Sequence, residues 1–220
     1  MTKKVSLPFS LVFLVATLGQ AQHSASSHVV PLQTFSRDHR FINVSGDPTK
    51  PGALYMLRIH SEAGYIIMPH THPEDEHITV LKGTWALGMG DRFDPKTLET
   101  MEVGGYGLVE KKMSHFGFSK TDAIVQVHGI GPFTTTWVTP MYQLTEKGVL
   151  LSTAANLPGQ PTATVPPDCF PLKLGTHAHA ALGEGVIVEA QCTPGQLTQY
   201  RIERPDGVLF WAQRAELTTK

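Results

Sequence analysis

Between residues 53 and 140, hydrophobic and polar positions alternate in short runs that turn residues separate. The runs are LYMLRIH, GYIIMPHTH, EHITVLKGTWALGMG, GYGLVEKK, HFGF, AIVQVHGIG and TTTWVTP. Alternation with a period of two is typical of strands with one buried face, and many short strands at this spacing indicate an all-β sandwich or barrel. Only DPKTLETMEV suggests a helical turn, with Asp94 as its cap. We therefore predict a β-barrel domain over residues 51–145.

The pattern changes after this domain. Residues 152–168, STAANLPGQPTATVPPD, are rich in proline and almost uncharged, which favours an extended linker, placed at 146–168. Four further strand-like runs follow, LKLGTHAHAAL, GEGVIVEAQ, LTQYRIERPDG and VLFWAQRAEL, and Pro205-Asp206-Gly207 marks a hairpin turn. Their rhythm resembles that of SH3-like barrels. We predict a small β-barrel over residues 169–220.

The N-terminus has the features of an export signal. MTKK is positively charged, VSLPFSLVFLVATLG is apolar, and Gly19-Gln20-Ala21 places small residues before a cleavage position after Ala21. A retained membrane anchor is the alternative, but Pro8 and Ser10 interrupt a run shorter than the ~20 residues of a spanning helix. We expect residues 1–21 to be removed and the protein to be periplasmic or extracellular. Residues 22–50 are expected to form an N-terminal arm with an edge strand near 29–32.

Composition limits the size of the core, the classes of binding partner and the state of the two cysteines. Hydrophobic residues make up 41% of the 220 positions, enough for one good core or two small ones. Eighteen Lys+Arg against 19 Asp+Glu give a net charge of -1, and no basic run follows the N-terminus, which excludes nucleic acid as a partner class. The two cysteines, Cys169 and Cys192, form either a disulfide worth about 3 kcal/mol or two buried thiols.

The stretch 69–83, PHTHPEDEHITVLKG, contains the strongest chemical signal. On a strand, His70 and His72 project from one face and can bind one metal ion. After the bend at Pro73, Glu76 brings a carboxylate to the same ion, and Gly83 permits the turn that ends the returning strand. This spacing favours a metal site over general acid/base chemistry.

These residues resemble the first motif of the cupin superfamily, G-x5-H-x-H-x3/4-E-x6-G. Gly64, His70, His72, Glu76 and Gly83 satisfy every position. In the second cupin motif Gly104 and His115 match, whereas three turn positions depart from it: Glu110 for proline, Lys112 for glycine and Ser119 for asparagine. The segment VQVHGIGPF is also similar to bacterial cupins.

The resemblance implies a jelly-roll cupin barrel and a fourth ligand, His115. It also implies one divalent transition metal per chain (Fe, Mn, Ni or Zn) bound by His70, His72, Glu76 and His115. Three imidazoles and one carboxylate leave one or two coordination positions open, as in a catalytic site.

Parity along the strands suggests further residues around this site. In AIVQVHG, Gln126 and His128 share one face, and we hypothesise that they point inward to bind substrate or move a proton. The alternative places Val125 and Val127 inside and the polar pair outside.

Other residues are candidates for the substrate pocket. On the face of His70 two side chains should line the cavity, Ile66 and Met68. Three aromatic residues either narrow its mouth or belong to the core: Trp85, Phe116 and Phe118. A second His-x-His pair, His177 and His179, has no carboxylate four residues on and is interpreted as a polar strand face.

The leading functional hypothesis is an exported, metal-dependent cupin enzyme acting on a small organic molecule, most simply a dioxygenase-type oxidoreductase. Isomerase, lyase or decarboxylase chemistry is an alternative in the same site. A second alternative is a non-catalytic, metal-dependent ligand-binding cupin of the cell envelope. A third is a structural cupin whose metal only stabilises the barrel. The resemblance also makes a homodimer one option. One fold shared by many activities does not select among them.

Overall fold

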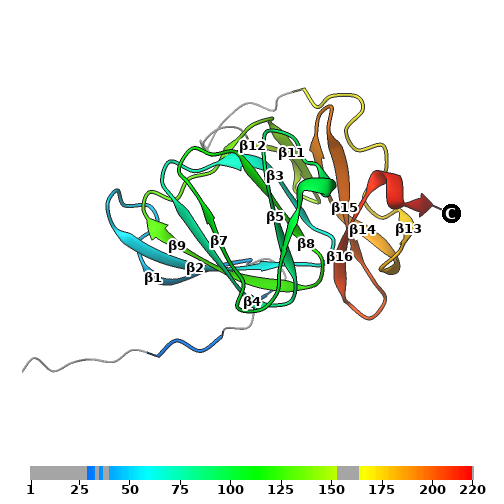
Figure 1. Ribbon diagram of the computed structural model, residues 1–220. Coiled ribbons are helices and arrows are strands. Elements are labelled where there is room, and N and C mark those ends of the chain that lie inside the picture. Colours follow the sequence, from blue (N-terminus) through cyan, green and yellow to red (C-terminus); the bar gives the residue numbers. More distant parts are fainter. Residues whose placement is uncertain (1–28, 33–34, 37–39, 153–163, 220) are drawn as a thin grey trace, which may run out of the picture. The chain divides into compact units, whose positions relative to one another are not determined.

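The computed structural model describes residues 29–32, 35–36, 40–152 and 164–219 (Figure 1). The predicted signal peptide, and parts of the predicted arm and linker, lie outside these ranges. The chain divides into two units, Met1–Leu32 and Gln33–Lys220, and the second is described below. The prediction of an all-β chain is confirmed. No helix in the described ranges is long and apolar enough to cross a bilayer.

Two five-stranded antiparallel sheets form the barrel (Figure 1). The first has the order β1 (Phe41–Gly46), β2 (Leu54–Ser61), β9 (Ala123–Ile130), β4 (Glu76–Lys82), β7 (Tyr106–Val109). The second has the order β10 (Thr136–Trp137), β3 (Ile66–Thr71), β8 (His115–Ser119), β5 (Trp85–Met89), β6 (Glu99–Met101). The chain changes sheet at every step from β2 to β10 except between β5 and β6, where the short helix η1 (Pro95–Thr97) lies. This alternation is that of a jelly roll.

Inward-facing residues of both sheets share one core. The alternating runs explain it, because every second residue of a half-buried strand faces the same side. The core contains Tyr55, Leu57, Ile59, Ile78, Val80, Trp85, Val109, Val125 and Val127. At the N-terminal edge, β1 pairs with β2, so the edge strand lies at 41–46 and not near the predicted 29–32, where the structure has no strand.

The C-terminal strands form a third antiparallel sheet. Its order is β12 (Gly148–Ser152), β11 (Met141–Thr145), β14 (Gly183–Thr193), β13 (His177–Ala180), β17 (Thr218–Thr219). β15 (Leu197–Glu203) pairs with β14 and with β16 (Leu209–Gln213), and the short helix η2 (Arg214–Glu216) follows. The structure differs from the predicted domain boundaries, because β11 and β12 belong to this sheet. Strand pairing across a proline-rich segment leaves no local signal.

Cys169 and Cys192 are bonded in the structure, with their Cα atoms 5.6 Å apart. Both residues are buried and pack with Tyr142 of β11. The bond therefore ties the segment before β13 to the end of β14 and the neighbouring β11.

Buried charges lie where the C-terminal sheet contacts the barrel. The Arg201 Nε donates a hydrogen bond to Glu62 Oε2 at 2.8 Å, and its Nη2 donates to Glu62 Oε1. Trp211 Nε1 donates to the same Glu62 Oε2 at 2.9 Å. The second carboxylate, Glu189, accepts from Arg201 at 3.4 Å and from Arg40 at 3.0 Å. Two cations thus balance two anions, as buried ions require.

Backbone contacts join the same two parts. Beyond the short pairing with β10, the edge of β3 is closed by the side chain of Gln199, which is 1% exposed. Ile66 N donates to Gln199 Oε1 at 3.0 Å, and Gln199 Nε2 donates to Ile66 O at 2.7 Å. Trp211 N donates to Ala63 O at 2.8 Å. The carboxamide therefore completes a strand edge that would otherwise leave polar backbone groups without partners.

Candidate metal centre

All four predicted ligands are brought together at one end of the barrel. His70 lies on β3 opposite His115 of β8, and His72 follows β3 directly. Glu76 begins β4 on the same face as the core residues Ile78 and Val80. Exposed fractions of 6% for His70, 5% for His72, 5% for Glu76 and 2% for His115 show that these polar side chains face the interior.

Each histidine is oriented through its Nδ1 atom. Backbone carbonyls lie 2.8 Å from this atom in His70 (Met68 O), 2.8 Å in His72 (Thr134 O) and 3.1 Å in His115 (Met113 O). A carbonyl can only accept a hydrogen bond, so Nδ1 carries the proton in all three rings. Each Nε2 therefore presents a lone pair, which is the arrangement that second-sphere contacts give to metal-binding histidines.

The remaining ligand atoms converge. One nitrogen of each histidine lies within 4.8 Å of those of the other two. Glu76 Oε2 is 3.0 Å from His115 Nε2 and 3.7 Å from His72 Nε2. Ligands about 2.1 Å from an ion and at right angles around it are about 3 Å apart, so these separations suit a common ion.

The residues present also fit a metal because, within the described part of the chain, three of their ligand atoms have no hydrogen-bond partner. Among the described residues, His72 Nε2, His115 Nε2 and Glu76 Oε2 are buried polar atoms without a hydrogen bond. Buried polar atoms rarely lack a partner in folded proteins. A divalent ion would satisfy all three, and with His70 it would leave one or two positions open.

Burial controls the protonation of two of these histidines. Burial, followed by the nearby His115 and His72, holds the pKa of His70 well below its ordinary value. Burial also lowers the pKa of His72, against the opposing influence of Glu76 and the Thr134 carbonyl. Both imidazoles are therefore neutral at pH 7, which is the form that binds metals.

One wall of the centre comes from residues that the sequence analysis did not single out. The ring of Phe133 stacks on His72 with a centroid distance of 4.5 Å, and Trp137 contacts His70 at 5.3 Å. Between them, Thr134 supplies the carbonyl that orients His72. The signal for these positions is weak, because a strand with aromatic residues reads as ordinary core and a backbone carbonyl has no sequence signature.

The predicted cavity residues Ile66 and Met68 require a correction. The register between β3 and β8 shifts between Ile67 and His70, which is a β-bulge that reverses the parity along β3. Ile67 packs against the barrel core in their place. Ile66 and Met68 are buried, at 1% and 2% exposure, but not in that core.

The three aromatic candidates for the pocket, Trp85, Phe116 and Phe118, do not lie on the same face of the barrel wall. Trp85 belongs to the barrel core. Phe116 follows His115 on β8 and therefore faces the opposite side, where it contacts Phe93 at 5.4 Å. Phe118 has the same parity as Phe116. Neither phenylalanine narrows the mouth, which corrects that part of the prediction.

Gln126 and His128 do not face the interior, so the hypothesis of an inward pair is wrong and the alternative with Val125 and Val127 inside describes the structure. Gln126 accepts a hydrogen bond from Arg58 at 3.2 Å. His128 stacks on His77 with a centroid distance of 4.9 Å. Val125 and Val127 occupy the inner face because burying apolar side chains is favourable, whereas on the outer face Gln126 has a hydrogen-bond partner and His128 stacks on the ring of His77.

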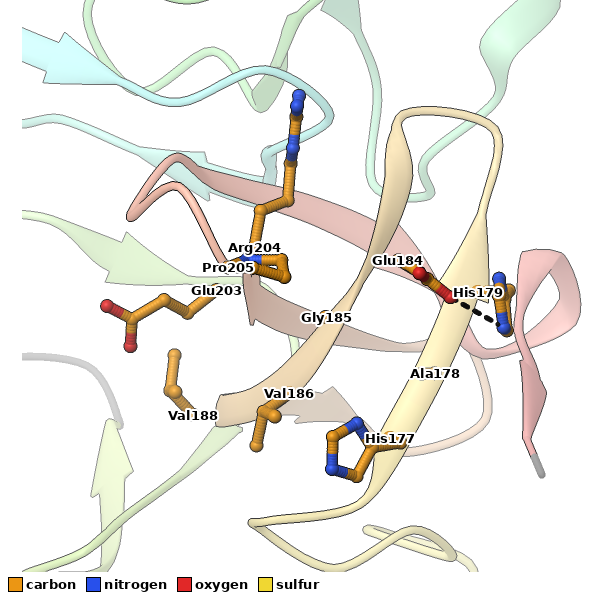
Figure 2. A pocket seen from close by; sticks show the side chains of 10 residues that line it. All are labelled: His177, Ala178, His179, Glu184, Gly185, Val186, Val188, Glu203, Arg204 and Pro205. Carbon is orange, nitrogen blue, oxygen red and sulfur yellow. Dashed lines mark ion pairs between the residues drawn. The ribbon is translucent and has the colours of Figure 1, made fainter.

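The second His-x-His pair lies on the C-terminal sheet. A surface cavity of about 550 Å³ is lined by residues of β13, β14 and β15, including His177 and Val186, and by Arg204, which follows β15. Figure 2 shows His179 directed at Glu184, 3.1 Å away, and His177 apart from both, beside Val186. The two rings do not converge on one point, which agrees with a polar strand face.

Comparison with known proteins shows only distant structural similarity. No protein-family model matches the chain, and no curated protein matches it. A protein with a double-stranded beta-helix domain from Klebsiella pneumoniae is 15% identical, with a TM-score of 0.40 over 54% of this chain and 95% of that chain. An RmlC-like cupin protein from Desulfovibrio desulfuricans is 21% identical, with a TM-score of 0.37 over 49% and 96%. Salicylate 1,2-dioxygenase from Pseudoaminobacter salicylatoxidans is 17% identical, with a TM-score of 0.34 over 42% and 25%.

Proposed function

We propose that this chain is an exported, metal-dependent enzyme of the cupin type that acts on a small organic molecule. The observation that carries the proposal is the orientation of three imidazoles by backbone carbonyls, which directs their free nitrogens to one place beside Glu76. A structural polar cluster would instead be satisfied by hydrogen bonds within the protein. The motif formed by Gly64, His70, His72, Glu76 and Gly83 supports the cupin assignment.

His70, His72, His115 and Glu76 would hold the ion, which we propose is iron, manganese, nickel or zinc. When bound, such an ion supplies Lewis acidity, and iron adds redox chemistry with dioxygen. The chain's own residues lower the pKa of His70 and His72, fix the orientation of all three imidazoles and enclose the ligand atoms within the barrel. Dioxygenase-type oxidation is the reaction class proposed first, with isomerase, lyase or decarboxylase chemistry as the alternative.

Export is proposed from the sequence of residues 1–21. The disulfide between Cys169 and Cys192 supports it, because such bonds persist in oxidising compartments and are rare in the reducing cytosol.

Metal content tests the first part of the proposal. The chain, expressed without a histidine tag, should contain about one transition metal per molecule by elemental mass spectrometry, and a His70→Ala/His72→Ala variant should contain almost none. The matched control is His177→Ala/His179→Ala, which removes the same pair from the C-terminal sheet and should keep the metal. A wild-type chain that takes up no iron, manganese, nickel or zinc after refolding with each ion would contradict the proposal.

Turnover separates an enzyme from the rival, a ligand-binding protein of the cell envelope. Iron-loaded protein should consume oxygen with one of a panel of small catechols and β-dicarbonyl compounds, which chelate a metal through two oxygens. Binding of such compounds without any chemical change, under air and with each metal, would favour the binding protein.

A further inference from the structure

A tyrosine and a metal ligand face each other across a glycine inside the barrel. His128 pairs with His77 of β4 on one side and with Met56 of β2 on the other. In antiparallel strands the next pair joins the residue before His77 to the residue after His128, so Glu76 lies opposite Gly129. On its other side, Gly129 pairs with Tyr55. All three residues are on the inner face. Because Gly129 has no side chain, nothing from β9 separates the Tyr55 and Glu76 side chains.

Close contacts show where the Tyr55 hydroxyl lies. A Cβ atom built on Gly129 would be 3.1 Å from this hydroxyl and 2.8 Å from the carbonyl oxygen of Asp75, the residue before Glu76. The Tyr55 ring also contacts Phe133 at 5.4 Å, and Phe133 stacks on His72. Two independent contacts thus place the phenol at the end of the barrel where the ligands converge.

The hydroxyl of Tyr55 has no hydrogen-bond partner among the described residues. Tyr55 is 4% exposed, and its hydroxyl makes no hydrogen bond within residues 40–152 and 164–219, but this oxygen is not among the fully buried polar atoms that lack a partner, so a molecule in the site can reach it. Burial, followed by the negative charge of Glu76, raises the pKa of Tyr55, so the hydroxyl keeps its proton. A protonated phenol hydroxyl donates a hydrogen bond where an acceptor is within reach. No acceptor among the described residues is bonded to this hydroxyl, so it is available to donate to a molecule bound beside Glu76.

We propose that the Tyr55 hydroxyl donates a hydrogen bond to an oxygen atom of the molecule bound at the histidine cluster. The inference rests on the proposed function, in which a cation is held by the histidines and Glu76. A ligand that uses both features needs one oxygen for the cation and a second oxygen for the hydroxyl. The simplest such group is a carboxylate, so the substrate class is a small carboxylic or hydroxycarbonyl compound.

Exogenous ligands of the metal test this directly. The full chain is loaded with Co²⁺, and its visible absorption is titrated with acetate and, separately, with imidazole. Acetate offers a second oxygen to Tyr55, whereas imidazole binds the metal through nitrogen and offers the hydroxyl no comparable acceptor. Tyr55→Phe should raise the acetate Kd about 3- to 10-fold, the range expected for one hydrogen bond, and leave the imidazole Kd unchanged.

The control is Tyr142→Phe, which removes the hydroxyl of another nearly buried tyrosine, in the C-terminal sheet. It should change neither constant, and all three proteins should bind equal amounts of cobalt. Equal acetate affinities for wild type and Tyr55→Phe would overturn the inference, as would an equal loss of imidazole binding, which would indicate a general disturbance of the site. If the wild-type chain binds no cobalt, the metal analysis shows this before acetate is added. That result would contradict both the proposed function and the inference that rests on it.

Discussion

At the scale of single residues, the space inside the barrel depends on positions without a side chain. Gly117 lies on the inner face of β8, two residues from His115, and the indole of Trp85 covers it. A Cβ atom at Gly117 would lie 2.3 Å from Cζ2 of that indole and 3.2 Å from Cε2. Trp85 is 3% exposed and part of the core, so the ring has little room to move. Gly117 is therefore required for packing beneath the candidate metal ligands.

We predict that Gly117→Ala lowers the free energy of unfolding by about 1–3 kcal/mol, the usual effect of overfilling a packed core. Urea denaturation followed by circular dichroism measures it. The control is Gly107→Ala, where the added Cβ would meet the ends of flexible side chains at 3.2 Å (Leu87) and 3.3 Å (Met101). It should lose less than about 1 kcal/mol. Equal losses for both variants would show that Trp85 yields as easily as these side chains.

At the scale of elements, the sequence predicted the strands and the convergence of His70, His72, Glu76 and His115 better than it predicted the residues around them. Period-two alternation identifies β2, β4 and β9, and the spacing of His70, His72 and Glu76 places these residues on adjacent ends of β3 and β4. A one-residue bulge in β3 is invisible to that pattern, yet it exchanges Ile67 for Ile66 and Met68 on the inner face. Contacts between distant segments, such as Thr134 with His72, are likewise not encoded in local periodicity.

The junction between β2, β3 and the C-terminal sheet allows a prediction at the same scale. Arg201→Met removes the cation that pairs with Glu62 and Glu189, whose exposures of 4% and 6% prevent water from replacing it. We expect a loss of about 3–5 kcal/mol in the free energy of unfolding, the cost of leaving a buried carboxylate unpaired.

Arg204→Met is the matched control. Arg204 pairs with Asp206 at 2.8 Å, but the two side chains are 40% and 50% exposed. Its removal should cost at most about 1 kcal/mol, as is usual for surface ion pairs. Denaturant titration of both variants gives the comparison, and an Arg201→Met variant as stable as Arg204→Met would show that the buried network does not join the two parts energetically.

At the scale of the whole molecule, the barrel and the C-terminal sheet share more than a linker. Gln199 of β15 completes the edge of β3, and Trp211 of β16 bonds to Ala63 and Glu62 just before β3. Loss of the C-terminal sheet would therefore leave polar backbone atoms of β3 and the carboxylate of Glu62 without partners. We infer that the two parts unfold as one cooperative unit, in contrast to two domains on a flexible linker.

Removal of the disulfide tests this cooperativity, because the change lies in the C-terminal part and its effect is measured in the barrel. Cys169→Ala/Cys192→Ala opens a loop with a sequence separation of 23 and should lower the free energy of unfolding by about 3 kcal/mol. Hydrogen exchange with mass spectrometry, measured across a urea series, should show peptides from β4 and β9 losing protection at the same reduced urea concentration as peptides from β14 and β15. The wild-type chain in the same series gives the reference midpoint. If β4 and β9 kept the wild-type midpoint while the C-terminal peptides opened earlier, the barrel would be stable by itself, and the buried contacts at Glu62 and Gln199 would serve only to dock the C-terminal sheet.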